Sequence, residues 1–170
     1  MSGRLVVSSP KNLGSERRVA AETALRLYGL SSVELELEED PAKSYINTLR
    51  GQVEALRLVE TLSKDTEPHV LRLHVTGLDI YFNDYYFCFG LAFKNAAVVS
   101  IFRLRDSQLG KFLSRLRKEV GHEIGHLLGL KHCTNPRCVM FFSNSILDTD
   151  FKGEEPCPKC RLQLARSGER

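Results

Sequence analysis

The stretch HEIGHLLGLKHC, residues 122–133, places three histidines, one glutamate and one glycine at fixed intervals. His122 and His126 are four residues apart, which on a helix puts both imidazoles on one face, one turn apart. Two imidazoles in that arrangement can share a tetrahedral zinc ion. Glu123 is rotated by about 100° around the helix from His122. It is therefore expected to face an open position of the metal rather than to bind it.

The second half of the stretch completes a longer pattern. Gly129 comes three residues after His126, and His132 three residues after Gly129. Glycine tolerates a positive φ, so Gly129 can end the helix and return His132 to the same metal. A lone H-E-x-x-H can occur on an ordinary apolar helix, but the full H-E-x-x-H-x-x-G-x-x-H is typical of zinc peptidases with three histidine ligands.

This pattern predicts a zinc-dependent peptidase. Three neutral ligands leave zinc its full charge, and zinc lowers the pKa of a bound water towards about 7. We expect Glu123 to accept a proton from that zinc-bound water and then to protonate the leaving amine.

Four of the five cysteines follow the histidines closely. Cys133 and Cys138 form one pair, and Cys157 and Cys160 form a C-x-x-C pair after a loop. This is the spacing of a closed, structural Cys₄ zinc site, which would hold the tail in place rather than catalyse. Two disulfide bonds and a nucleic-acid-binding zinc ribbon are the alternatives. Cys88 stands alone in an apolar stretch and is expected to be a buried thiol.

Length and composition indicate an ordinary globular chain. Its 170 residues are predicted to form one domain over residues 1–170. The net charge of +3 gives no reason to expect nucleic acid as a partner. No apolar run approaches the roughly 20 residues of a membrane span, and the N-terminus lacks the apolar core of a signal peptide. We therefore expect a cytoplasmic monomer with reduced thiols.

Hydrophobic periodicity gives the expected element order. Five strands are predicted at residues 4–9, 33–39, 69–76, 85–93 and 96–104. Helices are predicted from Ser15 as N-cap to a stop at Gly29, over residues 51–63 and 107–130, and in the tail after residue 160. The fold class is therefore α+β with an α/β-like order, an active-site helix and a short C-terminal helix.

Several other polar residues are interpreted as structural. Alternation in residues 33–39 predicts a half-exposed strand whose glutamates at 34, 36 and 38 face solvent. His69 and His74 point to opposite faces of a strand and are interpreted as surface or hydrogen-bonded core residues. A solvated basic face is expected for Lys111, Arg115, Arg117 and Lys118.

Beyond His132, the sequence C-T-N-P-R-C-V-M resembles the metzincin clan of zinc peptidases and, within it, the archaemetzincin family. Met140 matches the methionine of the clan's Met-turn. The family has a cysteine directly after the third histidine, a second before the Met-turn and a later C-x-x-C, as this chain does. The gap from Met140 to Cys157 is one residue shorter than the family pattern. The resemblance covers residues 122–160.

The resemblance implies a compact metzincin fold, with a twisted, mixed five-stranded sheet over the active-site helix. Residues 132–160 would form an irregular part holding the Met-turn and the Cys₄ site, and each chain would bind two Zn²⁺ ions. A peptide or protein substrate would lie along an antiparallel edge strand, for which residues 89–93 are the candidate. A hairpin strand that fills the core is the alternative for that segment.

Phe142 departs from the pattern of some metzincins. Two residues after the Met-turn methionine, those families carry a tyrosine whose phenol can reach the zinc. With Phe142 in that place, the zinc itself would have to stabilise the oxyanion. A catalytically weak or inactive zinc protein that binds peptides without cleaving them is therefore the alternative function.

Overall fold

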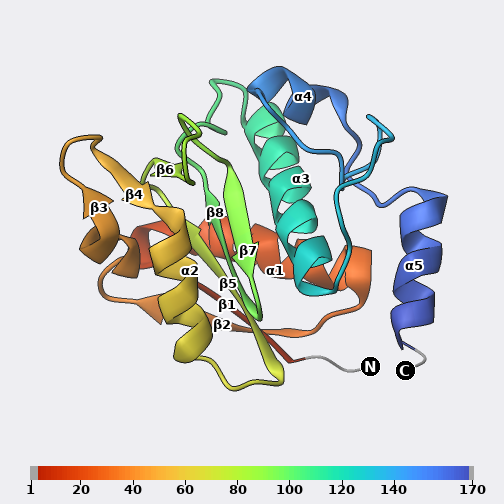
Figure 1. Cartoon of the computed structure of the whole chain (residues 1–170), viewed down its shortest axis with the longest axis horizontal. Helices are drawn as coiled ribbons and strands as arrows, with labels where there is room; N and C mark the ends of the chain where they lie inside the picture. Colours follow the sequence, from red (N-terminus) through yellow and green to blue (C-terminus); the bar gives the residue numbers. More distant parts are fainter. Residues whose placement is uncertain (1–3, 169–170) are drawn as a thin grey trace.

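A five-stranded sheet runs through the centre of the computed structural model, which describes residues 4–168 (Figure 1). In spatial order its strands are β2 (Ser32–Leu37), β1 (Arg4–Pro10), β5 (Val70–Thr76), β8 (Ala96–Ser100) and β7 (Gly90–Phe93). The first four are parallel to one another, and β7 is antiparallel to β8 at the edge of the sheet. The prediction of a mixed five-stranded sheet is confirmed.

Helices cover both faces of this sheet. Helices α1 (Gly14–Tyr28) and α3 (Leu109–Leu127) share one hydrophobic core with the sheet, and α2 (Ala55–Lys64) shares the other. Ala97 and Val99 of β8 belong to the first core, whereas Ala96 and Val98 belong to the second. A strand buried on both faces has a continuous apolar sequence, which explains why this segment shows no alternation.

A second, smaller sheet was not predicted. It has the order β3 (Ile46–Asn47), β4 (Gln52–Glu54) and β6 (Ile80–Tyr81). Because β4 pairs with both neighbours, α2 begins only at Ala55, and the prediction of a helix from residue 51 was wrong at its start. Two short 3₁₀ helices, η1 (Lys11–Leu13) and η2 (Pro41–Tyr45), precede α1 and β3.

Other boundaries also differ from the prediction. The strand predicted over residues 96–104 ends at Ser100, and the helix predicted over residues 107–130 spans Leu109–Leu127. Helix α1 ends at Gly29 with φ 66°, as predicted, but Leu13 rather than Ser15 occupies its N-cap position. The predicted strand over residues 85–93 is a strand only from Gly90 onward. Its first half forms a loop that pairs with β6 through a single bridge between Ile80 and Cys88.

The glutamates of the edge strand β2 are exposed, as predicted, but both faces of this strand are open, so its burial does not alternate. Glu34 and Glu36 lie towards α1, where Arg17 contacts their carboxylates at 3.3 and 3.4 Å. Val33 and Leu35 lie on the opposite face and are 50% and 41% exposed. Sequence alternation therefore predicted the strand but not its burial, because this edge strand has little cover on either face.

The prediction of a solvated basic face on α3 was wrong for Arg115 and Lys118, which are only 5% and 8% exposed. The short helix α4 (Ile146–Phe151) contacts this side of α3 and supplies the partners. Arg115 binds Asp150 through two nitrogens, at 2.6 and 2.8 Å. Lys118 donates to the carbonyls of Thr149 and Asp150.

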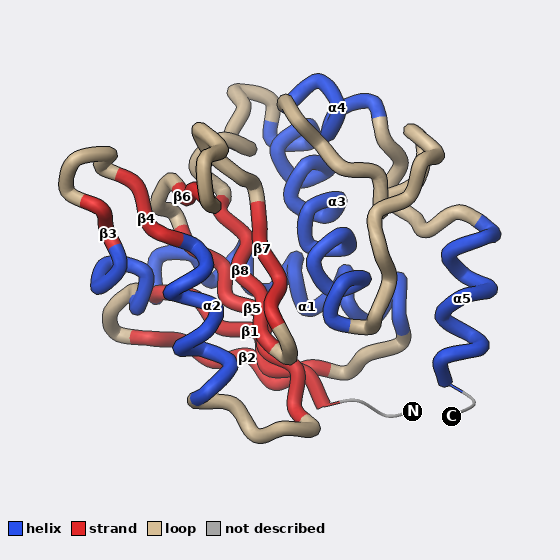
Figure 2. Tube along the Cα trace, in the orientation of Figure 1, coloured by secondary structure: helices blue, strands red, loops and turns tan. Residues whose placement is uncertain are grey.

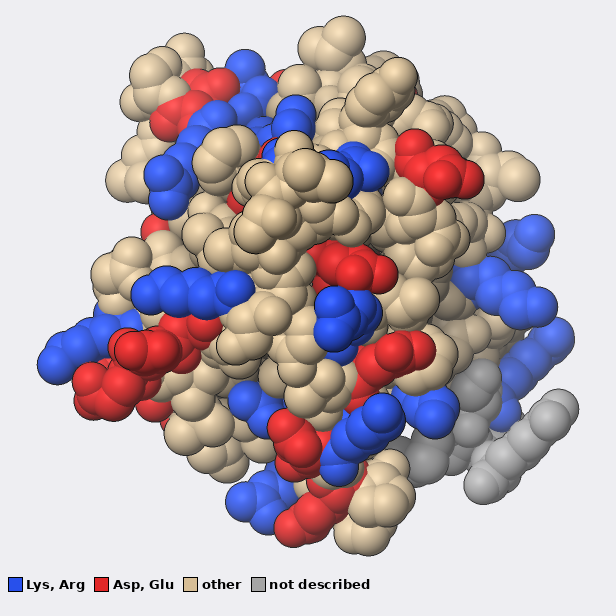
Figure 3. All heavy atoms as spheres, turned by 60° about the vertical axis from the view of Figure 1, so that its left-hand side comes forward, with Lys and Arg blue, Asp and Glu red and all other residues tan. Residues whose placement is uncertain are grey.

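Charges of both signs are mixed over the surface on the side shown in Figure 3. Arg117 and Lys111, the other two basic residues of α3, pair with Glu154 at 3.0 Å and with Asp106 at 3.3 Å. Within residues 4–168, no helix combines the length and apolarity needed to cross a membrane.

The C-terminal part is largely irregular, as predicted (Figure 2). Between α3 and the tail helix α5 (Pro158–Gly168), α4 is the one helix among the described residues. Ser145 caps α4 through a reciprocal pair of hydrogen bonds with Asp148. A small apolar cluster around Leu130, Val139 and Met140 joins this part to the end of α3.

Candidate metal centres

The two helical histidines lie on one face of α3, as their spacing predicts. Their Nε2 atoms are 3.1 Å apart. His122 Nδ1 lies 2.9 Å from the carbonyl of Val139, and His126 Nδ1 lies 2.8 Å from the carbonyl of Leu130. A carbonyl can only accept, so each Nδ1 carries the hydrogen and each neutral ring turns an Nε2 lone pair towards the other. Two lone pairs at that separation are stabilised by a cation bound between them.

His132 joins the two helical histidines after a turn. Gly129, at φ 89°, adopts the left-handed conformation that the sequence predicts at this position. The His132 ring lies 5.2 Å from the His122 ring and 4.8 Å from the His126 ring, measured between centroids. One ring nitrogen from each of the three histidines lies within 4.8 Å of the others, which suits a single metal ion.

Burial keeps these imidazoles neutral. It lowers the pKa of His122 well below the usual value, and the charge of Lys152 adds to the effect. Burial also lowers the pKa of His126 and of His132. Neutral imidazole is the form that binds a metal, so the protonation state fits the donor set.

Glu123 lies in the same cleft and is fully enclosed. Burial raises its pKa well above the usual value, and the nearby Glu119 carboxylate adds to this. Its Oε2 atom is buried without a hydrogen-bond partner within the described residues. A Cβ on Gly90 of β7 would lie 2.5 Å from Glu123 Oε1, so only glycine leaves room for the carboxylate here.

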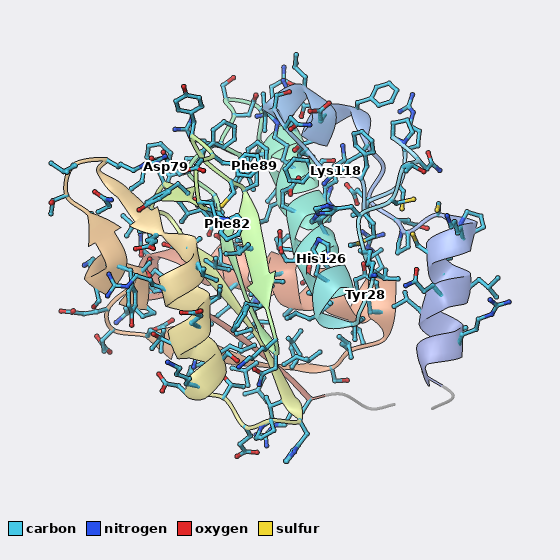
Figure 4. All side chains as sticks on the ribbon, viewed as in Figure 1. Tyr28, Asp79, Phe82, Phe89, Lys118 and His126 are labelled. Atoms are coloured by element: carbon cyan, nitrogen blue, oxygen red, sulfur yellow. The ribbon has the colours of Figure 1, made fainter. Side chains whose placement is uncertain are left out.

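The cleft between α3 and β7 holds about 470 Å³. Its walls include the three histidines, Glu119 and Glu123, and aromatic side chains at Tyr85, Phe87, Phe89 and Phe142. Figure 4 labels Phe89 beside the upper part of α3 and His126 near its lower end. The edge strand β7 forms one wall, while Phe89 just before it is 5% exposed and belongs to the core. The segment therefore contains both an antiparallel edge strand beside the cleft and a core residue, and peptide binding by this strand stays a prediction.

Met140 is fully buried beneath the histidines. The carbonyl of Cys138 accepts the N–H of Phe141 at 3.0 Å, which defines a turn over residues 138–141, called the Met-turn below. A Cβ on Gly125 would clash with Met140 Sδ, so α3 admits this close approach only at a glycine. Phe142 then lies against His132, with ring centroids 5.0 Å apart.

The four C-terminal cysteines also come together. Cys133 Sγ lies 3.8 Å from Cys157 Sγ, and Cys138 Sγ lies 3.8 Å from Cys160 Sγ. A tetrahedron of sulfurs about 2.3 Å from zinc has edges of about 3.8 Å. A disulfide needs about 2.05 Å. All four thiols are free, so the alternative of two disulfides does not describe this structure.

The electrostatics of the cysteine cluster are uneven. A hydrogen bond from the Cys160 N–H lowers the pKa of Cys157 to about 7. Burial raises the pKa of Cys138 and of Cys160. Backbone N–H groups directed at sulfur favour the thiolate, which is the form that zinc binds.

The remaining histidines and Cys88 lie outside both clusters. His69 is exposed, and His74 is a hydrogen-bonded core residue, with Ser8 Oγ and Asp40 Oδ1 each at 3.0 Å. Burial raises the pKa of Cys88, which lines the cleft as a thiol. Sequence analysis missed Glu119 at the cleft, although its place one helical turn before Glu123 was a usable signal.

Comparison with known proteins identifies the family. The model of peptidase family M54 matches residues 27–166. The chain belongs to this family. An archaemetzincin of Pyrobaculum aerophilum is 46% identical over 124 residues, covering 72% of this chain and 77% of the relative. An archaemetzincin of Methanocaldococcus jannaschii is 42% identical over 130 residues, covering 72% and 71%.

Solved archaemetzincin structures share the fold. The crystal structure from Methanopyrus kandleri matches with a TM-score of 0.88 at 30% identity, covering 99% of this chain and 97% of the other. The one from Archaeoglobus fulgidus, complexed with malonate, matches with a TM-score of 0.84 at 32% identity, covering 94% and 99%. The predicted archaemetzincin resemblance is confirmed, and the M54 chain is a zinc metallopeptidase.

Proposed function

We propose that this M54 chain hydrolyses peptide bonds at a zinc ion held by His122, His126 and His132. The observation that carries the proposal is the pair of Nε2 atoms 3.1 Å apart, each ring anchored through Nδ1 to a backbone carbonyl. Such anchoring fixes the tautomer and orientation that a ligand histidine needs. When bound there, zinc supplies a Lewis acid and makes a nearby water more acidic.

Glu123 is the general base in this proposal. Its unpartnered Oε2 can accept a proton from the attacking water, because that oxygen makes no competing hydrogen bond within the described residues. The same carboxyl then delivers the proton to the leaving amine. Gly90 supports the role by leaving space for Glu123 against β7.

The substrate is proposed to be an extended peptide paired with β7. The backbone N–H of Ser100 donates to the carbonyl of Phe89 at 2.8 Å. The hydrogen-bonded pairs between β7 and β8 therefore fall at positions 89, 91 and 93. The N–H and C=O groups of Gly90 and Ala92 therefore point away from β8, towards the open edge. A peptide strand added there would run along the cleft above the histidines.

A second zinc is proposed at Cys133, Cys138, Cys157 and Cys160. The two 3.8 Å sulfur separations support it, as does the burial of Cys138 and Cys160; Cys133 and Cys157 are partly buried. This closed site would act in folding, and each chain would carry two zinc ions.

The experiment is a peptide-library digest of the zinc-loaded protein, with Glu123→Gln as the matched variant. We expect Glu123→Gln to keep both zinc ions and its melting temperature and to lower kcat by about 10²- to 10⁴-fold. Elemental analysis gives the metal content. Cleavage by Glu123→Gln at the wild-type rate would contradict the role of Glu123.

One observation favours the alternative of a peptide-binding protein that cleaves weakly. Phe142 stands 5.0 Å from His132 and offers no phenol to the reacting carbonyl. A wild-type protein that carries zinc at the histidines and binds a peptide, yet releases it uncut, would support this alternative.

A further inference from the structure

Two buried charged side chains meet beside the cleft without belonging to either metal cluster. Glu119 of α3 is 3% exposed, and Lys152, just after α4, is 2% exposed. Lys152 Nζ lies 3.0 Å from Glu119 Oε1, and the Thr149 hydroxyl donates to the same oxygen at 2.9 Å. Glu119 also lines the cleft, so the ion pair borders the space where a substrate would lie.

Lys152 makes a second contact that leads to the histidine site. Its ammonium donates to the carbonyl of Phe141 in the Met-turn at 3.3 Å. The preceding residue, Met140, accepts the N–H of Cys133 at 2.9 Å. Cys133 directly follows His132, so a short series of contacts joins Glu119 on α3 to His132. Of the three clustered histidines, His132 is the one that lies outside α3.

Stability alone gives little reason for this arrangement. Removing two charges from water is costly, and well-packed apolar residues of similar size often serve a fold as well or better. What a buried pair provides is a single allowed arrangement of the elements that carry it. Here those elements are α3, which holds His122 and His126, and the segment after α4 that carries Lys152. Lys152 in turn holds the Met-turn beside His132 through the Phe141 carbonyl.

We propose that Lys152 is a positioning residue for the histidine site, and that its ammonium locks Glu119 and the Phe141 carbonyl in one arrangement that sets His132 against His122 and His126. The inference rests on the proposed function, because it takes the three histidines to be the ligands of one zinc. Contacts that orient ligands in this way typically change metal affinity by about 10- to 100-fold.

The chain offers a matched control in Lys118. It is also a buried lysine, 8% exposed, and its ammonium also donates to backbone carbonyls, those of Thr149 and Asp150, both at 3.0 Å. These carbonyls belong to α4 rather than to the Met-turn. Figure 4 labels Lys118 on the upper part of α3, away from His126.

The test measures zinc affinity at the histidine site by competition with a chelator, using full-length protein whose cysteine site remains loaded. Four variants are compared with wild type: Lys152→Met, Glu119→Gln, the double variant Glu119→Gln/Lys152→Met, and Lys118→Met. We expect Lys152→Met to weaken zinc binding by about 10- to 100-fold. Melting temperature is recorded for each.

The double variant separates positioning from stability. Because it buries neither charge, the double variant should have a higher melting temperature than Lys152→Met. Its zinc affinity should stay as weak, because the contact between Lys152 and the Phe141 carbonyl is still absent. Lys118→Met should lose melting temperature and keep wild-type affinity. Should Lys152→Met fail to fold, the charge-balanced double variant decides the question by itself.

Three results would overturn the inference: wild-type zinc affinity in Lys152→Met, wild-type affinity in the double variant, or an equal loss of affinity in Lys118→Met. A wild-type protein that binds zinc at the cysteines but none at the histidines would overturn the proposed function, and this inference with it. The wild-type titration therefore tells the two failures apart.

Discussion

The histidine cluster and the cysteine cluster are adjacent in sequence and opposite in construction. Two histidines come from one rigid helix, their rings are oriented by backbone carbonyls, and their nitrogens face a cleft of about 470 Å³. The cysteines come from loops and the start of a short helix, and they pack within their own apolar cluster. From this difference we expect the histidine site to depend on structure that forms without zinc, and the proposed cysteine site to stabilise the irregular part that carries it.

The largest expected effect comes from Cys157→Ser. Few apolar residues of the irregular part between α3 and α5 are buried, so loss of the cysteine site should lower the free energy of unfolding by about 4 kcal/mol or more. Elemental analysis should show one zinc lost per chain, and thermal denaturation should show the fall in stability. Unchanged metal content would contradict the proposal of a zinc ion at the four cysteines.

The next effect tests whether stability by itself controls metal binding. Asp40 lies on the α2 side of the sheet and accepts hydrogen bonds from His74 and from Thr76, at 3.0 and 2.6 Å. Asp40→Asn should lower the free energy of unfolding by about 2 kcal/mol at pH 7, since bonds to a charged acceptor are strong. Both zinc ions should remain bound. Loss of either ion would show that a fall in stability by itself is enough to weaken metal binding.

The same variant has a defined pH dependence. Burial pulls the pKa of Asp40 upward, but hydrogen bonds from His74 and Thr76 outweigh it, and the net pKa is lowered. A lowered carboxyl pKa stabilises the fold above the unfolded pKa of about 3.9 and loses that contribution as the pH falls through the folded value. Denaturant titrations should therefore show wild type and Asp40→Asn converging below about pH 4.

A smaller effect on stability is expected from His126→Ala. The variant loses one hydrogen bond, from Nδ1 to the Leu130 carbonyl, worth about 1 kcal/mol. It should lose the zinc of the histidine site and all peptidase activity while the cysteine site stays loaded. A fall in stability as large as that of Cys157→Ser would contradict the proposed difference between the histidine site and the cysteine site.

The smallest effect on the fold is expected from Ala92→Pro. Its N–H faces the open edge of β7, so proline removes a donor for substrate and no bond within the sheet. KM should rise by up to about tenfold, the value of one hydrogen bond. Leu91→Pro is the matched control, because the register places its N–H against β8, and this variant should unfold more readily.

What the sequence could predict depended on local geometry. The spacing of His122, His126 and Gly129 is a property of one helix and its end, so the grouping of three histidines was predictable. The grouping of the four cysteines was predictable from two closely spaced pairs, although the 3.8 Å separations join one cysteine of each pair to one of the other. The strands of the large sheet were recognisable because β2 alternates in sequence and each of the other four contains an apolar run.

The failures that matter most for the site and the fold involved partners on other elements. Glu119 and Lys152 are separated by 33 positions, and nothing in either neighbourhood indicates that they meet. Lys118 was taken for a surface residue because the pattern of α3 does not reveal that α4 covers it. Gln52–Glu54 became a strand because its partners, β3 and β6, override the helical periodicity of that segment.

The peptide bond between His132 and Cys133 has a consequence for how the protein matures. One residue belongs to the open cluster and the next to the closed one, and the Cys133 N–H is held by the Met140 carbonyl at 2.9 Å. If both proposed zinc sites form, we expect His132 to take a fixed position only after the four thiols have gathered. Zinc binding would then be ordered, with the cysteine site filled first and the histidine site second, so a partly loaded chain would be folded but inactive.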